Sequence, residues 1–215
     1  MRIALIEDHL MMRDILRKAC ALEAGYEVVA ECDRGKGAVA ALARRPADLV
    51  VLDLQLPDCD GLELIAALRS APAAPAVLVL SSRCDAFTVF QLERAEIAGF
   101  IDKGSQTVAM LGYALRAIAE GRRYFSPVFT RVRQDRLLNP RSFDKVLSDR
   151  EQVVLACLGD CCSDRETAER LGISPQTAQK HRFNLMRKLN LDSMAAAIRF
   201  AQANGFYFAR IKHRL

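Results

Sequence analysis

The chain has 215 residues, of which 51% are hydrophobic and 27% charged, and its formal net charge at pH 7 is +5. This is the composition of a globular protein, with enough chain for one large hydrophobic core or two modest ones. No apolar run approaches the roughly 20 residues of a membrane-spanning helix, and the N-terminal stretch turns acidic too early for a signal peptide. We therefore expect a cytoplasmic protein that makes no use of a membrane.

Charge is divided unevenly along the chain. Residues 1–120 contain 13 Lys and Arg against 17 Asp and Glu, a net charge of −4. Residues 121–215 contain 18 against 9, a net charge of +9. An acidic half joined to a basic half indicates different partners for the two, with a polyanion for the second. Uneven charge on a single domain is the alternative that charge alone leaves open.

The seven cysteines do not form a metal-binding pattern. Their number is odd, the pair Cys161-Cys162 is adjacent rather than spaced as C-x-x-C, and no histidine pair accompanies it. Free thiols are the expected state. Cys59 is the one reservation, because it stands in the predicted loop beside Asp53.

The first 120 residues alternate between strand-length apolar runs and longer helical stretches. The strand candidates are 2–7, 26–32, 49–53, 76–81 and 99–102. The helix candidates are 10–23, 36–44, 61–69, 86–95 and 106–119, with Gly25 as a C-cap of the first and Asp60 as the N-cap of the third. Several strands are apolar on both faces, as in a covered parallel sheet. The pattern predicts an α/β, doubly wound, five-stranded parallel sheet of flavodoxin-like type.

The stretch "LVVLDLQLPDCDG" places a carboxylate, Asp53, directly after an apolar run and before a turn. An isolated charge in a core is costly unless it is paired or lies at an opening. In doubly wound sheets, ligands bind beyond the carboxyl ends of the strands. Other strands end there in Glu7-Asp8, Ser81-Ser82 and Asp102-Lys103. We therefore expect carboxylates, a hydroxyl and an amine to meet at one edge of the sheet.

This set of groups suggests a specific chemistry. Crowded carboxylates repel one another unless a cation neutralises them, and oxygen ligands with room for water suit Mg²⁺. A single aspartate held there can act as a nucleophile towards a phosphoryl group and form an aspartyl phosphate. Lys103 would then pair with the phosphate charge, and Ser81 would donate a hydrogen bond to it.

Four motifs make the first 121 residues resemble the receiver domain of a bacterial two-component response regulator. They are "LIEDH" for the acidic pair, "LDLQLPDCDG" for the phosphoacceptor strand and turn, "VLS" for the switch hydroxyl and "GFIDK" for the switch aromatic and lysine. The four together cover the whole segment, which we expect to be one domain over residues 1–121.

The resemblance implies a role for each matching residue. Asp53 would be the phosphoacceptor, Lys103 would contact the phosphate, and Ser81 would follow the phosphate inward. Phe100 would be the switch aromatic. The side chains implied to hold Mg²⁺ are Glu7 (through water), Asp8 and Asp53. Gly104 stands where many receivers have proline after the lysine, which predicts a more mobile loop.

Residues 122–146 interrupt the pattern and are expected to be a linker. Ser126-Pro127 indicates the start of a short connecting helix. A looser stretch is expected around Asn139-Pro140.

Strand signals are absent from residues 147–215, which we expect to form an all-α, four-helix DNA-binding domain. "LSDREQVVL" and "SDRETAERLG" each open with Ser followed three residues later by Glu, the pattern of a capping box. Gly172 then ends the second helix, and Ser174-Pro175 begins a third. A fourth helix is expected at about 193–204. Two short helices joined by a tight turn, the second of them cationic, are typical of a DNA-reading helix-turn-helix.

The helix over 175–189 has two distinct faces. Ala178, Leu185 and Leu189 share one phase and are expected in the core. The residues on the opposite face are Gln176, Gln179, Lys180, Phe183 and Arg187. A solvated cationic helix with no ligand is the alternative reading of this pattern.

Residues 147–207 also resemble the LuxR-type helix-turn-helix of NarL/FixJ-subfamily response regulators, on "LSDREQVVL…SDRETAERLGISPQTAQKHRFNLMRKLNL". The residues expected to contact DNA are Gln176, Thr177, Gln179, Lys180, His181, Phe183, Arg187 and Lys188. Family members often have Val-Lys where this chain has Ala178-Gln179, which leaves base preference open. Gln179 is a candidate to read adenine, and Phe183 to touch a thymine methyl group.

The two resemblances together predict a DNA-binding transcriptional response regulator, not an enzyme, switched by Mg²⁺-dependent phosphorylation of Asp53. The expected partners are a sensor histidine kinase or a small phosphodonor, promoter DNA with inverted half-sites, and a second copy of the chain in the active state. A Mg²⁺-dependent phosphatase is one alternative, although Gln55 stands where such enzymes commonly carry a second Asp. Regulation without phosphate, by a partner or by thiol chemistry at Cys59, is the other.

Overall fold

The structure is a computed structural model that describes residues 1–71, 73–104 and 107–207. The chain divides into two compact units. The first comprises Met1–Cys84 and Gln91–Arg131, and the second Asp85–Phe90 and Val132–Leu215. The domain predicted over 147–215 extends beyond the described part of the chain, because residues 208–215 lie outside it. The boundaries predicted at residues 121 and 146 stay predictions.

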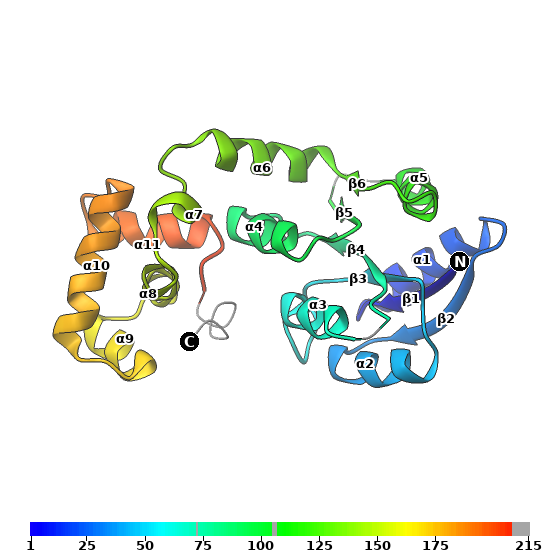
Figure 1. Ribbon diagram of the computed structural model, residues 1–215, viewed down its shortest axis with the longest axis horizontal. Coiled ribbons are helices and arrows are strands. Elements are labelled where there is room, and N and C mark those ends of the chain that lie inside the picture. Colours follow the sequence, from blue (N-terminus) through cyan, green and yellow to red (C-terminus); the bar gives the residue numbers. More distant parts are fainter. Residues whose placement is uncertain (72, 105–106, 208–215) are drawn as a thin grey trace. The chain divides into compact units, whose positions relative to one another are not determined.

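The first unit is built on a parallel sheet (Figure 1). Among the described residues the strand order is β2-β1-β3-β4-β5-β6, and every neighbouring pair is parallel. The strands are β1 (Arg2–Ile6), β2 (Glu27–Cys32), β3 (Leu49–Leu52), β4 (Ala76–Ser81), β5 (Gly99–Asp102) and β6 (Tyr124–Phe125). The predicted doubly wound sheet is confirmed, with one correction. The sixth strand, two residues long, was not expected, because a segment this short carries no periodic signal.

Five helices follow the first five strands in turn: α1 (Leu10–Ala21), α2 (Gly35–Arg44), α3 (Gly61–Arg69), α4 (Ala86–Arg94) and α5 (Val108–Ala119). The part of α4 up to Phe90 is assigned to the second unit. Asp60 caps α3 as predicted, since its carboxylate accepts a hydrogen bond from the Leu62 amide. The prediction for Gly25 was wrong. Helix α1 already ends at Ala21, and Gly25 lies in the following turn with φ of 82°.

One face of the sheet is covered by α1 and α5. Buried side chains of β1, β3 and β4, such as Leu5, Val51 and Leu78, pack there with Leu16 of α1 and Leu115 of α5. Strand β3 is buried along its full length. A polar side chain of this segment therefore has room only past the end of β3, which is where Asp53 stands.

The second unit is helical, and α6 (Pro127–Leu138) leads into it. Its further helices are α7 (Phe143–Val146), α8 (Asp149–Gly159), α9 (Asp164–Leu171), α10 (Pro175–Leu189) and α11 (Met194–Ala203). The sequence predicted one helix in the segment before residue 147. The structure has two, because the buried Phe143 anchors a single extra turn.

The predicted caps of the helical unit are present. Ser148 with Glu151 and Ser163 with Glu166 form complete capping boxes. Gly172 ends α9 in the left-handed conformation, with φ of 62°. The core is formed by α8, α10 and α11, and it contains Ala178, Leu185 and Leu189, which are buried as expected. Among the described residues, no helix has both the length and the apolar character needed to span a bilayer.

Candidate functional site

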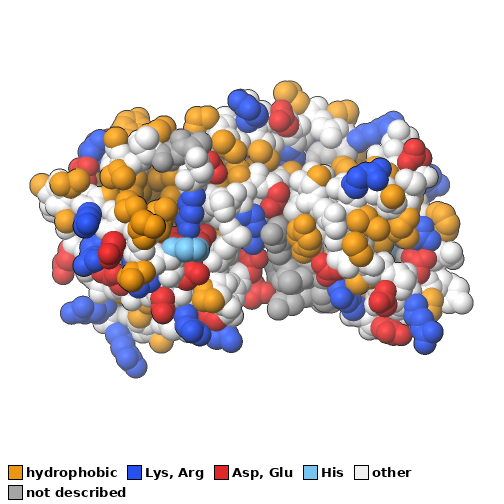
Figure 2. All heavy atoms as spheres, turned by 180° about the vertical axis from the view of Figure 1, so that it is seen from behind, with side chains coloured by type: hydrophobic (Ala, Val, Ile, Leu, Met, Phe, Trp, Pro, Cys, Tyr) orange, Lys and Arg blue, Asp and Glu red, His pale blue; other side chains and the backbone are white. Residues whose placement is uncertain are grey.

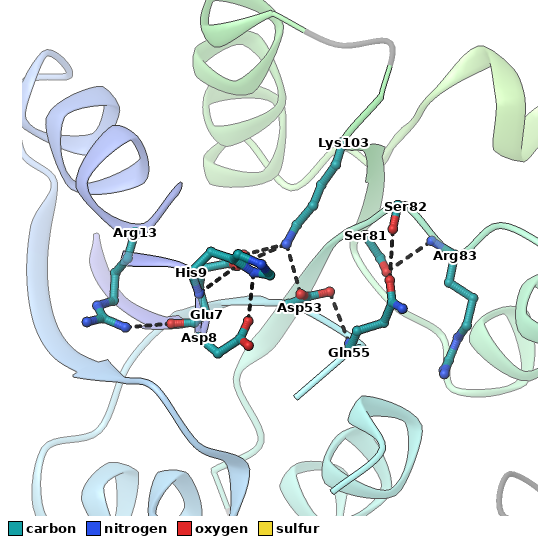
Figure 3. Close-up of polar contacts among 10 residues, drawn as sticks. All are labelled: Glu7, Asp8, His9, Arg13, Asp53, Gln55, Ser81, Ser82, Arg83 and Lys103. Carbon is teal, nitrogen blue, oxygen red and sulfur yellow. Dashed lines mark hydrogen bonds and ion pairs between the residues drawn. The ribbon is translucent and has the colours of Figure 1, made fainter. Parts of the chain in front are cut away.

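The predicted polar groups of the first unit meet where β1, β3, β4 and β5 end (Figure 3). Asp53 follows β3 directly, and its amide donates to the carbonyl of Ile6 on the neighbouring β1 over 2.9 Å. This bond continues the sheet by one residue, so the Asp53 side chain leaves the strand end at a fixed position. The residue is only 3% exposed. A carboxylate buried to this degree requires a counter-charge.

Lys103 supplies that charge. Its ammonium nitrogen lies 2.8 Å from Asp53 Oδ2, 3.0 Å from Glu7 Oε1 and 2.8 Å from Glu7 Oε2. Glu7 is 1% exposed, so one ammonium serves two buried carboxylates. Burial alone lowers the pKa of Lys103, but its hydrogen bonds to Asp53 and Glu7 outweigh burial and raise the pKa above the ordinary value. The lysine is therefore cationic at neutral pH.

Glu7, Asp8 and Asp53 form an acidic cluster together with His9. One potential ligand atom from each of the four lies within 4.8 Å of the others. Glu7 Oε2 and Asp8 Oδ1 are buried and accept no hydrogen bond from the described residues; their close contacts are the Lys103 ammonium and His9 Nδ1, respectively. Buried oxygens with unused lone pairs suit a hard cation, so the donor set fits Mg²⁺.

The hydroxyls lie beside the phosphoacceptor candidate but do not bond it. Ser81 is fully buried at the end of β4, where its hydroxyl accepts from the Arg83 amide over 3.2 Å. Ser82 Oγ donates to Gln55 Oε1 over 2.8 Å. Gln55 in turn donates its backbone N–H to Asp53 Oδ1 over 3.1 Å. Asp53, Gln55 and Ser82 are thus linked by two successive hydrogen bonds.

Phe100, the expected switch aromatic, is fully buried on β5. Its ring packs against Phe129 with a centroid distance of 5.1 Å, and Phe129 stacks on Phe125 of β6 at 4.8 Å. The aromatic is therefore held in a small cluster on the strand that Lys103 directly follows.

The structure adds two residues that sequence reasoning missed. Arg83 forms a two-pronged ion pair with Asp60, with both N–O distances 2.8 Å, and so ties the end of β4 to the cap of α3. His9 directs Nδ1 at Asp8 Oδ1, 2.9 Å away. Arg83 left no signal in the sequence. His9 did, because it directly follows the acidic pair at a strand end.

The candidate DNA-contacting residues lie along α10. Those exposed to solvent are Gln176, Thr177, Gln179, Lys180, Phe183, Arg187 and Lys188, and His181 is half-buried. Lys188 and Thr177 have hydrogen-bonding partners within the domain. Lys188 Nζ is 2.7 Å from Glu151 Oε2, and Thr177 donates its amide to the cap residue Ser174 over 3.1 Å.

Arg182, which the sequence analysis did not single out, makes contacts that organise this face of α10. It pairs with Asp164 of α9 through two N–O contacts of 2.8 and 2.9 Å, and its guanidinium carbon lies 4.6 Å from the centre of the Phe183 ring. This arrangement joins α9 to α10 and supports a Phe183 that stays 57% exposed. Figure 2 shows basic and acidic side chains interspersed on the face that it displays.

Comparisons with known proteins agree with both units. The family "Response regulator receiver domain" matches residues 3–114, and "Bacterial regulatory proteins, luxR family" matches residues 145–201. The nitrate/nitrite response regulator protein NarP of Escherichia coli is 34% identical over 95% of this chain and 96% of its own. The transcriptional regulatory protein UhpA of Escherichia coli is 32% identical over 89% and 92%. Among solved structures, the RcsB–DNA complex matches with a TM-score of 0.67 and 21% identity over 94% and 98% of the two chains.

A receiver joined to a LuxR-type helix-turn-helix is the class of protein that this fold and these matches define. The chain belongs to the NarL/FixJ-type two-component response regulators, which are DNA-binding transcription regulators. The predicted family and fold are confirmed.

Proposed function

We propose that DNA binding by this chain is switched by Mg²⁺-dependent phosphorylation of Asp53. The observation that carries the proposal is a buried Asp53 placed 2.8 Å from the ammonium of Lys103 and beside the Glu7–Asp8 pair. An aspartate so placed combines a nucleophilic oxygen with the positive charge that an incoming phosphoryl group needs.

Mg²⁺ would be held by Asp8 and Asp53, with Glu7 acting through water. The ion would supply positive charge against the phosphoryl oxygens as the group is transferred. The buried oxygens Glu7 Oε2 and Asp8 Oδ1, which accept no hydrogen bond within the described chain, support this assignment.

The residues of the chain would carry out the transfer itself. A carboxylate oxygen of Asp53 forms the new P–O bond, while the bond from phosphorus to the donor breaks and the donor leaves with its electron pair. Lys103 would then pair with the phosphate, and Ser81 would turn its hydroxyl from the Arg83 amide towards a phosphate oxygen. Phe100, packed on Phe129, would repack as the hydroxyl moves.

The donor would be a phosphohistidine of a sensor kinase or a small acyl phosphate, in the cytoplasm. The output would be binding of α10 to promoter DNA with inverted half-sites by two copies of the chain. The RcsB–DNA complex among the fold neighbours and the exposed polar face of α10 support this reading.

The alternatives gain no support from the site. Mg²⁺-dependent phosphatases commonly carry a second Asp two residues after the nucleophile, whereas here that position is Gln55, whose amide oxygen accepts a hydrogen bond from Ser82. A thiol switch at Cys59 needs a reactive thiolate, yet burial, followed by the neighbouring Asp58, raises the pKa of that thiol.

The test is a titration with beryllofluoride, a stable phosphoryl analogue, read out as affinity for a promoter fragment selected with the full chain. With Mg²⁺ the wild type should gain about 5–150-fold in DNA affinity, the range of ordinary allosteric coupling. The gain should vanish in Asp53→Asn and in the absence of a divalent ion, and persist in Cys59→Ser. An equal gain in Asp53→Asn would reject the proposal, and loss of the gain in Cys59→Ser would favour the thiol switch.

A further inference from the structure

We propose that His9 is an additional, nitrogen-bearing ligand of the cation site, so that the site binds first-row transition ions such as Mn²⁺ more tightly than its carboxylates alone would. This inference rests on the cation site of the proposed function. It concerns the chemical class of the ion, which the carboxylates leave open.

The position of His9 is fixed by its neighbours. It occupies the N-cap position of α1, but its side chain makes no capping hydrogen bond. Its backbone N–H donates to Glu7 Oε1 over 3.3 Å, which holds the loop against the acidic residue. The imidazole is therefore not used to cap the start of α1.

The imidazole instead faces the carboxylates (Figure 3). Nδ1 lies 2.9 Å from Asp8 Oδ1 and 3.4 Å from Glu7 Oε1. Asp8 Oδ1 is the same buried oxygen that accepts no hydrogen bond from the described residues. Lys103 reaches Glu7 and Asp53, whereas His9 is in close contact with Asp8.

The four donors are close enough to share one ion. They lie within 4.8 Å of one another. Metal–ligand bonds of transition ions to nitrogen and oxygen are about 2.0–2.2 Å long, so donors on opposite sides of one ion are about 4.0–4.4 Å apart. A contraction of about 0.4–0.8 Å at most, well within the reach of an exposed side chain at a helix start, completes the set.

The choice of donor decides the choice of ion. Mg²⁺ is a hard ion that keeps waters and prefers oxygen, so an imidazole adds little to its binding. Mn²⁺, Co²⁺ and Zn²⁺ accept imidazole readily, and mixed nitrogen and carboxylate sites bind them more tightly than Mg²⁺. The alternative is a solvated histidine that only hydrogen-bonds to Asp8, which is consistent with its 74% exposed side chain.

The test uses the full chain with Mn²⁺ as the probe. Pulsed electron paramagnetic resonance detects ¹⁴N of an imidazole bound directly to Mn²⁺. The wild type should show this coupling, and His9→Ala and His9→Asn should lose it, whereas the matched control His181→Ala on α10 should keep it. Mn²⁺ affinity should fall in His9→Ala by about tenfold or more, since loss of even an outer partner of a metal ligand costs 10–100-fold. Mg²⁺ affinity should change by less than about twofold.

The outcomes separate the two proposals. Mn²⁺ bound without ¹⁴N coupling, or an unchanged ratio of Mn²⁺ to Mg²⁺ affinity in His9→Ala, would reject the ligand role of His9 and leave the phosphorylation switch intact. If neither ion bound to the wild type, the cation site and the proposed function would fail together.

Discussion

Lys103 is the residue on which the receiver site depends most. Two carboxylates that are almost fully buried, Glu7 and Asp53, are neutralised by its single ammonium. Removing one partner of a buried ion pair is far more costly than removing a surface pair, because the remaining charge has neither water nor a partner. The lysine that we propose to pair with the phosphate therefore also neutralises the carboxylates of the resting site.

Lys103→Met should make the receiver unit unstable in the absence of a divalent ion. Losing the counter-charge is expected to cost about 3–5 kcal/mol. Added Mg²⁺ should restore more stability than it adds to the wild type, because it replaces the missing positive charge. Thermal unfolding by circular dichroism with and without Mg²⁺ measures both effects. Lys18→Met, an exposed lysine of α1, is the matched control and should change neither; an equal Mg²⁺ effect in all three proteins would contradict the prediction.

Gly61 is required by close approach rather than by backbone conformation. A Cβ there would lie 2.5 Å from the Leu54 Cα and 2.8 Å from the Asp53 carbonyl oxygen, both of which are backbone atoms that cannot turn away. A Cβ on Gly37 of α2 would meet nothing within 4 Å. The start of α3 thus lies directly against the backbone of Asp53 and Leu54.

Gly61→Ala should cost about 1–3 kcal/mol and also slow phosphorylation, because relief of the clash displaces Asp53. Gly37→Ala should leave the site unchanged and stabilise the helix by about 0.5–1 kcal/mol. Chemical denaturation and the rate of labelling by an acyl phosphate measure the two effects. Wild-type behaviour of Gly61→Ala in both measurements would show that the close approach is relaxed in solution.

At the scale of elements, α10 carries two kinds of arginine, one paired within the domain and one exposed to solvent. Arg182 is used within the domain, where it holds Asp164 of α9, and its side chain is 12% exposed. Arg187, on the same helix, is exposed. The two arginines therefore form a matched pair for assigning the DNA-facing side.

Arg182→Ala should lower the thermal stability of the helical unit, because it breaks the link between α9 and α10 and leaves Asp164 without its partner. Arg187→Ala should leave stability within about 0.5 kcal/mol and weaken DNA binding uniformly across sequences. The salt dependence of its binding should fall by about one phosphate contact. A salt slope identical to wild type would place Arg187 away from the DNA backbone.

Helix α8 is linked to α10 by the ion pair between Glu151 and Lys188. Burial raises the pKa of Glu151, but the hydrogen bonds from Lys188 and Ser148 lower it by more. The net result is a pKa below the ordinary value of 4.5. A carboxylate with a lowered folded-state pKa stabilises the fold fully above its unfolded pKa. That contribution is lost as pH falls through the folded pKa.

Glu151→Gln keeps the geometry of the capping box but removes the charge. The variant should be less stable than wild type near neutral pH, and the two should converge as pH falls below about 4.5, where the wild-type carboxylate takes up its proton. Chemical unfolding of both proteins, followed by circular dichroism at 222 nm across this pH range, measures this difference in stability. Glu169→Gln, in an exposed pair with Arg165, should stay within about 0.5 kcal/mol of wild type at neutral pH. A constant gap between Glu151→Gln and wild type at all pH values would exclude the charge as its cause.

For the whole molecule, the proposed switch has a thermodynamic consequence. If beryllofluoride raises affinity for DNA by some factor, DNA must raise affinity for beryllofluoride by the same factor. Calorimetric titration of beryllofluoride into the full chain, with and without its selected DNA fragment, should give that equality. Unequal factors would mean that a further equilibrium, such as association of two copies, contributes to the response.

The sequence by itself determined the order of the strands and helices other than β6 and α7, the caps at Asp60, Ser148, Ser163 and Gly172, and the family. These features depend on neighbours within a few residues, and such local preferences are written in the chain itself. It also determined which side chains reach the strand ends, because in a parallel sheet those ends share one edge.

Only the tertiary structure decided how those side chains meet. Lys103 and Glu7 are 96 residues apart in sequence, and Arg83 and Asp60 are 23 apart. No local pattern encodes that one lysine serves two carboxylates, that Arg182 holds Asp164, or that His9 turns towards Asp8 instead of capping α1. Side-chain directions of this kind are set by packing between distant segments, and they decide which charges are already paired and which are left to bind a ligand.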